Sequence, residues 1–286
     1  MSINTLKTAA LLGLLTALLV LGGGYLMGRN GLYIGLVFAG AMNFAGYFFS
    51  ERIALLSYSA QPVTPQANAA IYHRLAPIVQ RLTQRMGLPM PRLWLVPQPS
   101  PNAFATGRNP SHASVAVTSG LLDAMDDREL EGVLAHELGH VLHRDILIAS
   151  VAAMLAGTIF MLAHLARWGM IFGGVSRDDG ERRGGILVEL LMLLLAPLAA
   201  ALIQAAISRS REFEADAASA EYTGSPYELI SGLQKLEAYS RRIPMDASPA
   251  TAHMFIVRPN PGRFVMNLFS THPPTAARIA RLQAIR

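Results

Sequence analysis

The residues best suited to chemistry stand near the middle of the chain, in the run His136-Glu137-Leu138-Gly139-His140. A spacing of four residues places the two histidines on one face of a helix, about a turn and ~6 Å apart. Both imidazoles can then reach one metal ion, and zinc takes histidine nitrogens at ~2.0–2.1 Å. The Glu137 carboxylate can contact a water bound to that ion without itself being a ligand. The run therefore predicts a metal site with an acid/base beside it.

A third ligand has to come from outside this run, because a catalytic zinc site takes three protein ligands and keeps one position open. His143 shares the helix face of His136, but seven residues place it ~10.5 Å along the axis, too far for both to bind one ion. The other local pattern requires glycine and histidine three and six residues past the second histidine. Those positions hold His143 and Ile146, so this pattern fails.

The best candidate for the third ligand lies in segment 208–216, which directly follows a long apolar block. Glu212 and Asp216 are four residues apart and share a helix face, whereas Glu214 points away from both. A helix that places Glu212 on zinc can place Asp216 behind a ligand histidine as a hydrogen-bond acceptor. The alternative for Glu212 is a solvated acid beside the neighbouring arginines.

The apolar residues of the chain are concentrated in blocks. Of the 286 residues, 52% are hydrophobic and only 15% are charged, whereas a soluble domain is about a quarter charged. A helix needs ~20 apolar residues to cross a bilayer. Blocks of about that length run from about 8–27, 32–49, 146–172 and 185–207. They predict four transmembrane helices in two hairpins, at 1–50 and 146–207. A cleaved signal peptide is the alternative for the first block, but that block lacks an Ala-x-Ala site.

Two hairpins return the chain to the same side of the membrane, so the polar pieces 51–145 and 208–286 can form one catalytic domain. We expect small residues of the second block, namely Gly35, Gly40 and Gly46, to let the first two helices approach closely. Lys and Arg near the span ends are equally numerous on both sides, so charge does not orient the chain.

The polar pieces predict a mainly helical α+β domain with a small sheet. Asp126 and the acidic residues after it favour the start of the helix that carries the two histidines. Alternating β-branched residues predict a strand at 114–118. The other predicted elements are a strand at 92–96 and helices at 66–87, 209–222, 227–242 and 274–284.

The charge and the cysteine content exclude several classes of protein. The net charge of +5 comes without basic runs or interleaved aromatic residues, so we expect no nucleic-acid partner. Basic residues that flank membrane spans near anionic lipid account for the charge. Cysteine is absent, which excludes disulfides and thiolate metal sites.

Three other interpretations of the chain compete with a membrane-anchored metallopeptidase. An intramembrane protease would carry the histidine pair inside a span, but the charged residues around the pair make burial in the bilayer costly. A non-catalytic membrane scaffold would have no use for Glu137. A transporter would need polar residues at matching depths in several spans, and only His164 and Glu189 are candidates.

The sequence resembles the HtpX family of membrane-embedded zinc metalloproteases, which are related to the CAAX prenyl proteases. The resemblance covers nearly the whole chain. The segments that carry it are Ala135-His136-Glu137-Leu138-Gly139-His140, Ser208-Arg209-Ser210-Arg211-Glu212-Phe213-Glu214-Ala215-Asp216 and Thr271-His272-Pro273-Pro274-Thr275 with Arg278-Ile279. It implies a zincin-like fold and one Zn²⁺ per chain. The implied ligands are His136, His140 and Glu212, with Glu137 as the catalytic acid/base.

The resemblance also implies roles for residues that surround the metal. Asp216 would lie behind a ligand histidine, Arg278 would be the basic partner of Asp216, and His272 would stabilise the charged transition state. A loop histidine before a Pro-Pro turn is the alternative for His272.

The remaining implications concern the substrate and the cellular location. The segment Asn102-Ala103-Phe104 resembles the approach to an edge strand where a polypeptide substrate would lie. Members of the family are quality-control proteases of the bacterial inner membrane. They act on misfolded membrane proteins, and their catalytic domain faces the cytoplasm.

Overall fold

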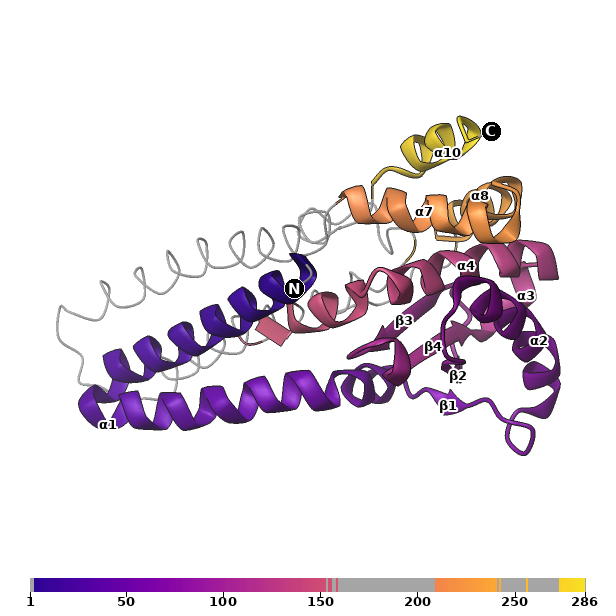
Figure 1. Cartoon of the computed structure of the whole chain (residues 1–286). Coiled ribbons are helices and arrows are strands. Elements are labelled where there is room, and N and C mark those ends of the chain that lie inside the picture. Colours follow the sequence, from indigo (N-terminus) through magenta and orange to yellow (C-terminus); the bar gives the residue numbers. More distant parts are fainter. Residues whose placement is uncertain are drawn as a thin grey trace.

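The computed structural model describes residues 3–152, 154–155, 158, 209–240, 242, 256 and 273–285 (Figure 1). Two long helical arms extend from one end of a domain in which helices surround a small sheet. Within the predicted blocks 146–172 and 185–207, only residues 146–152, 154–155 and 158 are described, and they are helical. The fourth predicted span lies wholly outside the described residues.

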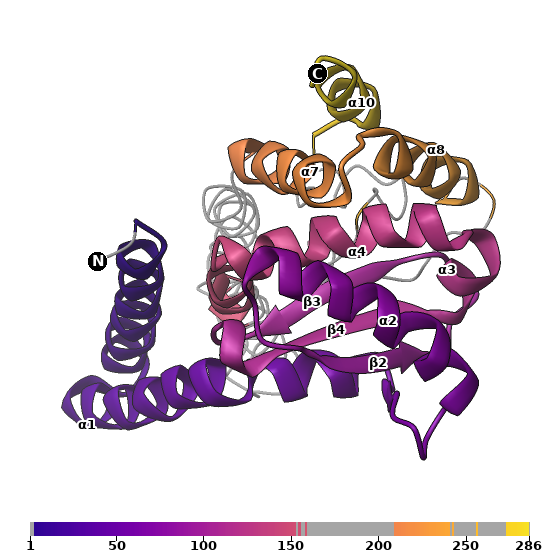
Figure 2. The same cartoon turned by 45° about the vertical axis from the view of Figure 1, so that its right-hand side comes forward.

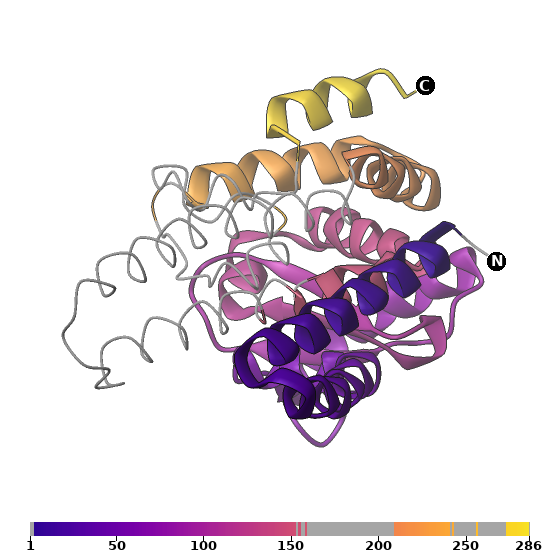
Figure 3. The same ribbon diagram turned by 90° about the vertical axis from the view of Figure 1, so that its left-hand side faces the viewer.

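The first two apolar blocks form one helical hairpin, α1 (Ile3–Ser57), which breaks at Gly28. Gly28 has φ +61° and ψ −144°, a backbone conformation that residues other than glycine rarely adopt. Leu6–Gly24 and Met27–Ser57 are each long and apolar enough to cross a membrane. The two arms lie side by side in Figures 1 and 3. This part of the chain therefore confirms two membrane-capable helices.

The close approach of the two arms depends on a different set of glycines from the one expected. A Cβ at Gly35 would lie 2.4 Å from Leu19 O, and one at Gly23 would lie 2.3 Å from Gly31 O. Gly40, by contrast, faces open space, and a Cβ at Gly46 would meet the side chain of Met154. The prediction was thus right for Gly35 and wrong for Gly40 and Gly46. Gly46 instead allows the close approach of Met154, which belongs to the helix after α4.

The sheet has four strands in the order β1-β2-β4-β3. Strand β2 (Arg92–Val96) pairs in parallel with β4 (Ala113–Thr118), and β3 (Ala103–Gly107) pairs antiparallel with β4 at the edge. The short strand β1 (Gln61–Pro62) pairs antiparallel with β2 at the other edge, and the 3₁₀ helix η1 (Pro110–His112) precedes β4. Because β3 is an edge strand, one side of its backbone is left for other partners.

Both faces of the sheet are covered, so every residue of β4 is buried. Val115 and Val117 face the main core, which α2 (Ala69–Met86) and α4 (Asp127–Leu142) complete. On the opposite face, Ala116 and Phe104 pack against Leu55 near the end of α1 and against Tyr58 just after it. The second arm thus continues past the predicted boundary at residue 50 and joins the sheet (Figure 2). A helix of 31 residues is ~46 Å long and exceeds the ~30 Å of hydrocarbon, which leaves a turn or more for this contact.

A second helical layer covers α4 on the side away from the sheet (Figure 2). It consists of α7 (Arg209–Thr223), α8 (Tyr227–Ser240) and α10 (Thr275–Gln283), and the short helix α3 (Ser119–Ala124) leads into α4. The predicted mainly helical fold with a small sheet is confirmed, and α4 lies between the sheet and α7, where it can carry a site that both sides complete.

Candidate metal and active site

Helix α4 begins at a strong local signal. The Asp126 carboxylate accepts from the backbone N–H groups of Arg128 and Glu129, and the Glu129 carboxylate accepts in return from Asp126 N–H. This reciprocal capping box satisfies amide groups that a helix start leaves unpaired. Glu129 also accepts from Ser231 and Lys235 of α8, at 2.6 Å each. The start of α4 is therefore fixed both along the chain and against α8.

Small residues bring α4 and α7 into close contact. A Cβ added at Gly139 would lie 3.2 Å from Ala215 Cα, so only a residue without a side chain fits there comfortably. Ser219 Oγ donates to the carbonyl of Gly132 at 2.7 Å, which aligns the other end of α7 with the start of α4. The two helices thus run antiparallel, and this alignment places Glu212 opposite the histidine pair.

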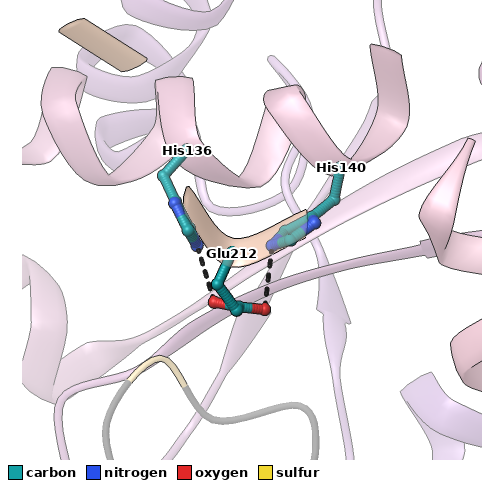
Figure 4. Close-up of side chains that lie close together, drawn as sticks. All are labelled: His136, His140 and Glu212. Atoms are coloured by element: carbon teal, nitrogen blue, oxygen red, sulfur yellow. Dashed lines mark ion pairs between the residues drawn. The ribbon is translucent and has the colours of Figure 1, made fainter. Parts of the chain in front are cut away.

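His136, His140 and Glu212 form a group whose ligand atoms all lie within 4.8 Å of one another (Figure 4). The Nε2 atoms of His136 and His140 lie 3.7 and 3.6 Å from the two carboxylate oxygens of Glu212. Tetrahedral ligands at ~2.0–2.1 Å from zinc lie ~3.4 Å apart, close to these separations. Glu214 of the same helix is exposed to solvent. The structure therefore assembles the three residues predicted as ligands and leaves Glu214 away from them.

The hydrogen bonds behind the two imidazoles favour a cation between them. His136 Nδ1 lies 3.0 Å from Asp216 Oδ1, and His140 Nδ1 lies 3.3 Å from Asp145 Oδ2. A carboxylate accepts only, so each neutral ring places its proton on Nδ1 and its lone pair on Nε2. Two such lone pairs then face the Glu212 carboxylate in a buried site. This donor set fits a divalent ion that prefers nitrogen and oxygen ligands, such as zinc.

Asp216 is itself held by Arg278 from helix α10. The guanidinium donates twice to the carboxylate, at 2.6 Å from NH2 and 2.9 Å from Nε, and donates to Ile256 O at 3.0 Å. Its NH2 also lies 3.3 Å from His136 Nδ1. Arg278 is only 1% exposed, so this is a buried, bidentate ion pair. The ion pair joins α10 to α7, and the contact of Arg278 with His136 extends this link to α4.

The charges of the site set the pKa values of its residues. Burial and the nearby Arg278 charge lower the pKa of His136 to about 4, which keeps this ring neutral at pH 7. Burial on its own would also lower the pKa of His140, but the carboxylates of Glu212, Asp145 and Glu137 outweigh it and raise the pKa to about 9. In the metal-free protein His140 is therefore protonated at neutral pH, and a metal ion has to displace that proton.

Glu137 points toward the sheet. Its Oε2 accepts from the backbone N–H of Ala105 at 2.9 Å, and the side chain is almost fully buried. Ala105 lies at the middle of the edge strand β3, so this bond joins the predicted acid/base to the strand nearest to the site. The sequence did not indicate this contact, because a backbone donor leaves no mark in the residue type.

The residues predicted to bind substrate are buried. Asn102, Ala103 and Phe104 are each less than 5% exposed. Asn102 Oδ1 accepts from Ile256 N–H at 3.2 Å, and Phe104 packs under the sheet beside Tyr58. Only the backbone edge of β3, and not these side chains, is placed to meet a peptide. His272 lies outside the described residues.

The prediction did not include Asp145, whose carboxylate contacts the imidazole of His140. It lies five residues after His140, just past the end of α4, and Arg211 NH1 donates to its Oδ1 at 3.2 Å. A buried acid beside a metal ligand acts as an orienting acceptor. The available signal was an acidic residue at the junction between the motif helix and the third apolar block.

A helix that carries His-Glu-x-x-His, a carboxylate from a second helix and a flanking edge strand together define the class of metallopeptidases. Residues 70–286 match peptidase family M48. The Protease HtpX homolog of Desulforapulum autotrophicum is 54% identical over 280 residues, which are 98% of this chain and 89% of that protein. Protease HtpX of Legionella pneumophila is 49% identical over 286 residues, 99% of each protein. This chain belongs to peptidase family M48.

A likeness to a solved structure supports the fold. The crystal structure of S. mikatae Ste24p has a TM-score of 0.55 and 18% sequence identity to this chain, and it matches 98% of this chain and 65% of that one. At this level of identity the likeness concerns the fold alone. It agrees with the mainly helical architecture described above.

Proposed function

We propose that this chain is a zinc-dependent endopeptidase, anchored in a membrane by four helices in two hairpins, with its site at the membrane surface. The observation that carries the proposal is the group of His136, His140 and Glu212, in which His136 and Glu212 are buried and His140 is half-buried, with Glu137 beside it. Membership in peptidase family M48 supports peptide-bond hydrolysis. The donor set, two imidazoles and one carboxylate, supports zinc as the metal.

The proposed roles at the metal rest on this geometry. His136, His140 and Glu212 would hold the ion, and a zinc ion there would supply a Lewis acid for the scissile carbonyl and for an attacking water. Asp216 fixes the ring of His136 through Nδ1, and Arg278 fixes the carboxylate of Asp216. The same bonds keep the lone pair on Nε2, the atom that faces Glu212 and would bind the ion.

Glu137 is the proposed proton carrier. Its carboxylate would take a proton from the attacking water and deliver that proton to the leaving amine. The N–H of Ala105 holds one oxygen of this carboxylate in place. His272, which precedes α10 by only a few residues, is proposed to stabilise the negative charge that develops on the carbonyl oxygen.

An extended polypeptide is the proposed substrate. Such a chain can add a strand to the outer edge of β3, beside the Ala105 N–H that donates to Glu137, and main-chain bonds there give affinity without strong sequence preference. The side chains of Asn102, Ala103 and Phe104 are buried, and Asn102 directs its backbone N–H and C=O to Thr118 of β4. A peptide would therefore contact only the outward-facing backbone groups of β3. The hydrogen bond from Ala105 to Glu137 brings the same edge to the acid/base, so a peptide bound there would pass beside the metal.

The membrane part of the proposal rests on the hairpin. Large apolar side chains, among them Leu21, Val37 and Phe44, are more than half exposed along α1, as expected for helices that face lipid. The resemblance to the HtpX family supports a bacterial inner-membrane location, a catalytic domain that faces the cytoplasm and a role in the quality control of misfolded membrane proteins.

The test of the proposed function is Glu137→Gln in the full-length protein, purified in detergent. We expect this variant to bind one zinc ion as the wild type does and to lose casein hydrolysis, because an amide cannot carry the proton. Addition of EDTA should abolish wild-type hydrolysis. A variant that still cleaves casein at the wild-type rate would contradict the assignment. A wild-type protein without zinc and without activity would instead support a membrane scaffold that keeps the fold.

A further inference from the structure

Asp145 lies behind the second histidine of the site in the same way that Asp216 lies behind the first. Its Oδ2 is 3.3 Å from His140 Nδ1, and its side chain is almost fully buried. The two imidazoles thus each have a carboxylate of their own on the atom that faces away from Glu212. Asp145 stands beyond the end of α4, so its position depends on the path of the backbone between Leu142 and the next helix.

A break in the backbone makes this contact possible. In a continuous helix, a residue five positions after His140 would lie ~140° around the axis and would point away from it. Here α4 ends at Leu142, and Arg144 adopts the left-handed conformation with φ +60°. The next helix then starts at Asp145 itself. A residue other than glycine in this conformation costs of order 1 kcal/mol and persists where the surroundings require it. Because of this turn, the Asp145 carboxylate points toward His140 and not away from it.

Two further donors fix the Asp145 carboxylate. Arg211 NH1 donates to Oδ1 at 3.2 Å, and Asn4 Nδ2 donates to the same oxygen at 2.9 Å. Asn4 also donates to the carbonyl of His143 at 3.0 Å. Arg211 directly precedes Glu212 on α7, and Asn4 stands at the start of α1. One oxygen therefore receives these two side chains, and the other remains for His140.

The geometry points to Asp145 as the positioning residue for His140, a role that rests on the zinc site of the proposed function. By accepting from Nδ1, Asp145 keeps the Nε2 lone pair directed at the ion and limits rotation of the ring. A carboxylate in this place also increases the basicity of a ligand imidazole. Arg211 of α7 and Asn4 of α1 hold Asp145 in place. The orientation of His140 on α4 therefore depends on residues from three parts of the fold.

The test compares zinc binding by Asp145→Asn with that of the wild-type chain in detergent. An amide is a weaker acceptor than a carboxylate, so we expect affinity for Zn²⁺, measured by competition with a chelator, to fall about 10- to 100-fold. The visible spectrum of the Co²⁺-loaded protein, which reports ligand geometry, should shift as well. Since Asp145→Asn leaves the buried Arg211 charge without its partner, a second variant, Asp145→Asn/Arg211→Met, removes that charge and keeps the test independent of folding.

A matched substitution provides the control. Asp127→Asn makes the same chemical change in an exposed ion pair with Arg74, away from the metal, and should leave zinc affinity within about twofold of the wild type. If the double variant binds Zn²⁺ as tightly as the wild type and keeps its Co²⁺ spectrum, Asp145 has no positioning role. That result differs from a failure of the proposed function itself, in which the wild type would bind no zinc.

Discussion

Breaking the buried pair of Asp216 and Arg278 from either side should destabilise the metal-free protein strongly. Asp216→Asn removes the negative charge and one of the two oxygens that now lie 2.6 and 2.9 Å from a guanidinium that is only 1% exposed. Removing one partner of a buried pair typically costs about 3–5 kcal/mol, because the remaining charge stays buried. Arg278→Met should cost a similar amount, since it leaves the Asp216 carboxylate buried next to His136.

The pKa of Asp216 gives a second measure of the same interaction. Burial on its own would raise this pKa, but Arg278 and His136 outweigh it and lower the pKa from 3.8 to about 2. This shift corresponds to roughly 2 kcal/mol of stability. The pKa is lower in the folded state, so the contribution is present above about pH 4 and is lost as the pH falls through about 2.

The assay is a double-mutant cycle in denaturant on the metal-free protein in detergent. The wild type, Asp216→Asn, Arg278→Met and the double variant are compared at pH 7. We expect the double variant to be less destabilised than the sum of the single variants by at least about 2 kcal/mol. Single variants that each cost less than about 1 kcal/mol, and that add without coupling, would refute the reasoning.

Four further predictions concern His140 and the start and packing of α4. In a chelator competition assay, apparent zinc affinity should rise about tenfold per pH unit from about pH 6.5 to 9. The reason is that the pKa of His140 is about 9 and the metal has to displace its proton. An affinity that does not change with pH would contradict this. Over the same pH range the free energy of unfolding of the metal-free protein should fall, because the stabilisation from protonated His140 is lost. Gly132→Ala should cost about 1–3 kcal/mol in denaturant unfolding, since its Cβ would lie 2.6 Å from Leu229 N, whereas Gly40→Ala faces open space and should not. Asp126→Ala should lower the free energy of unfolding by about 1 kcal/mol through loss of the cap, and an unchanged unfolding midpoint would argue against the capping box.

Local signals in the sequence were enough to predict the main elements. Asp126 marks the start of α4, and Gly87, with φ +65°, ends α2 close to the predicted position. The strand at 114–118 agrees with β4 (Ala113–Thr118). By contrast, β1 has only two residues and hence no periodicity, and β3 is buried on both faces, so neither shows the alternation that identifies a strand.

Helix periodicity also predicted the carboxylate of the proposed ligand set, because Glu212 and Asp216 share a face of α7 while Glu214 points to solvent. The same reasoning could not find Asp145. Its contact with His140 depends on a left-handed residue, Arg144, that is not a glycine and therefore carries no turn signal. Contacts made by a backbone break or a backbone amide require the tertiary structure.

The metal content of two neighbouring variants tests the central claim most directly. Glu212→Gln and Glu214→Gln make the same chemical change two residues apart on α7, one beside the histidines and one in solvent. Zinc measured by mass spectrometry on purified, chelator-washed protein should be one ion per chain in the wild type and in Glu214→Gln, and it should be largely lost in Glu212→Gln. Loss of zinc in Glu214→Gln with full retention in Glu212→Gln would contradict the account.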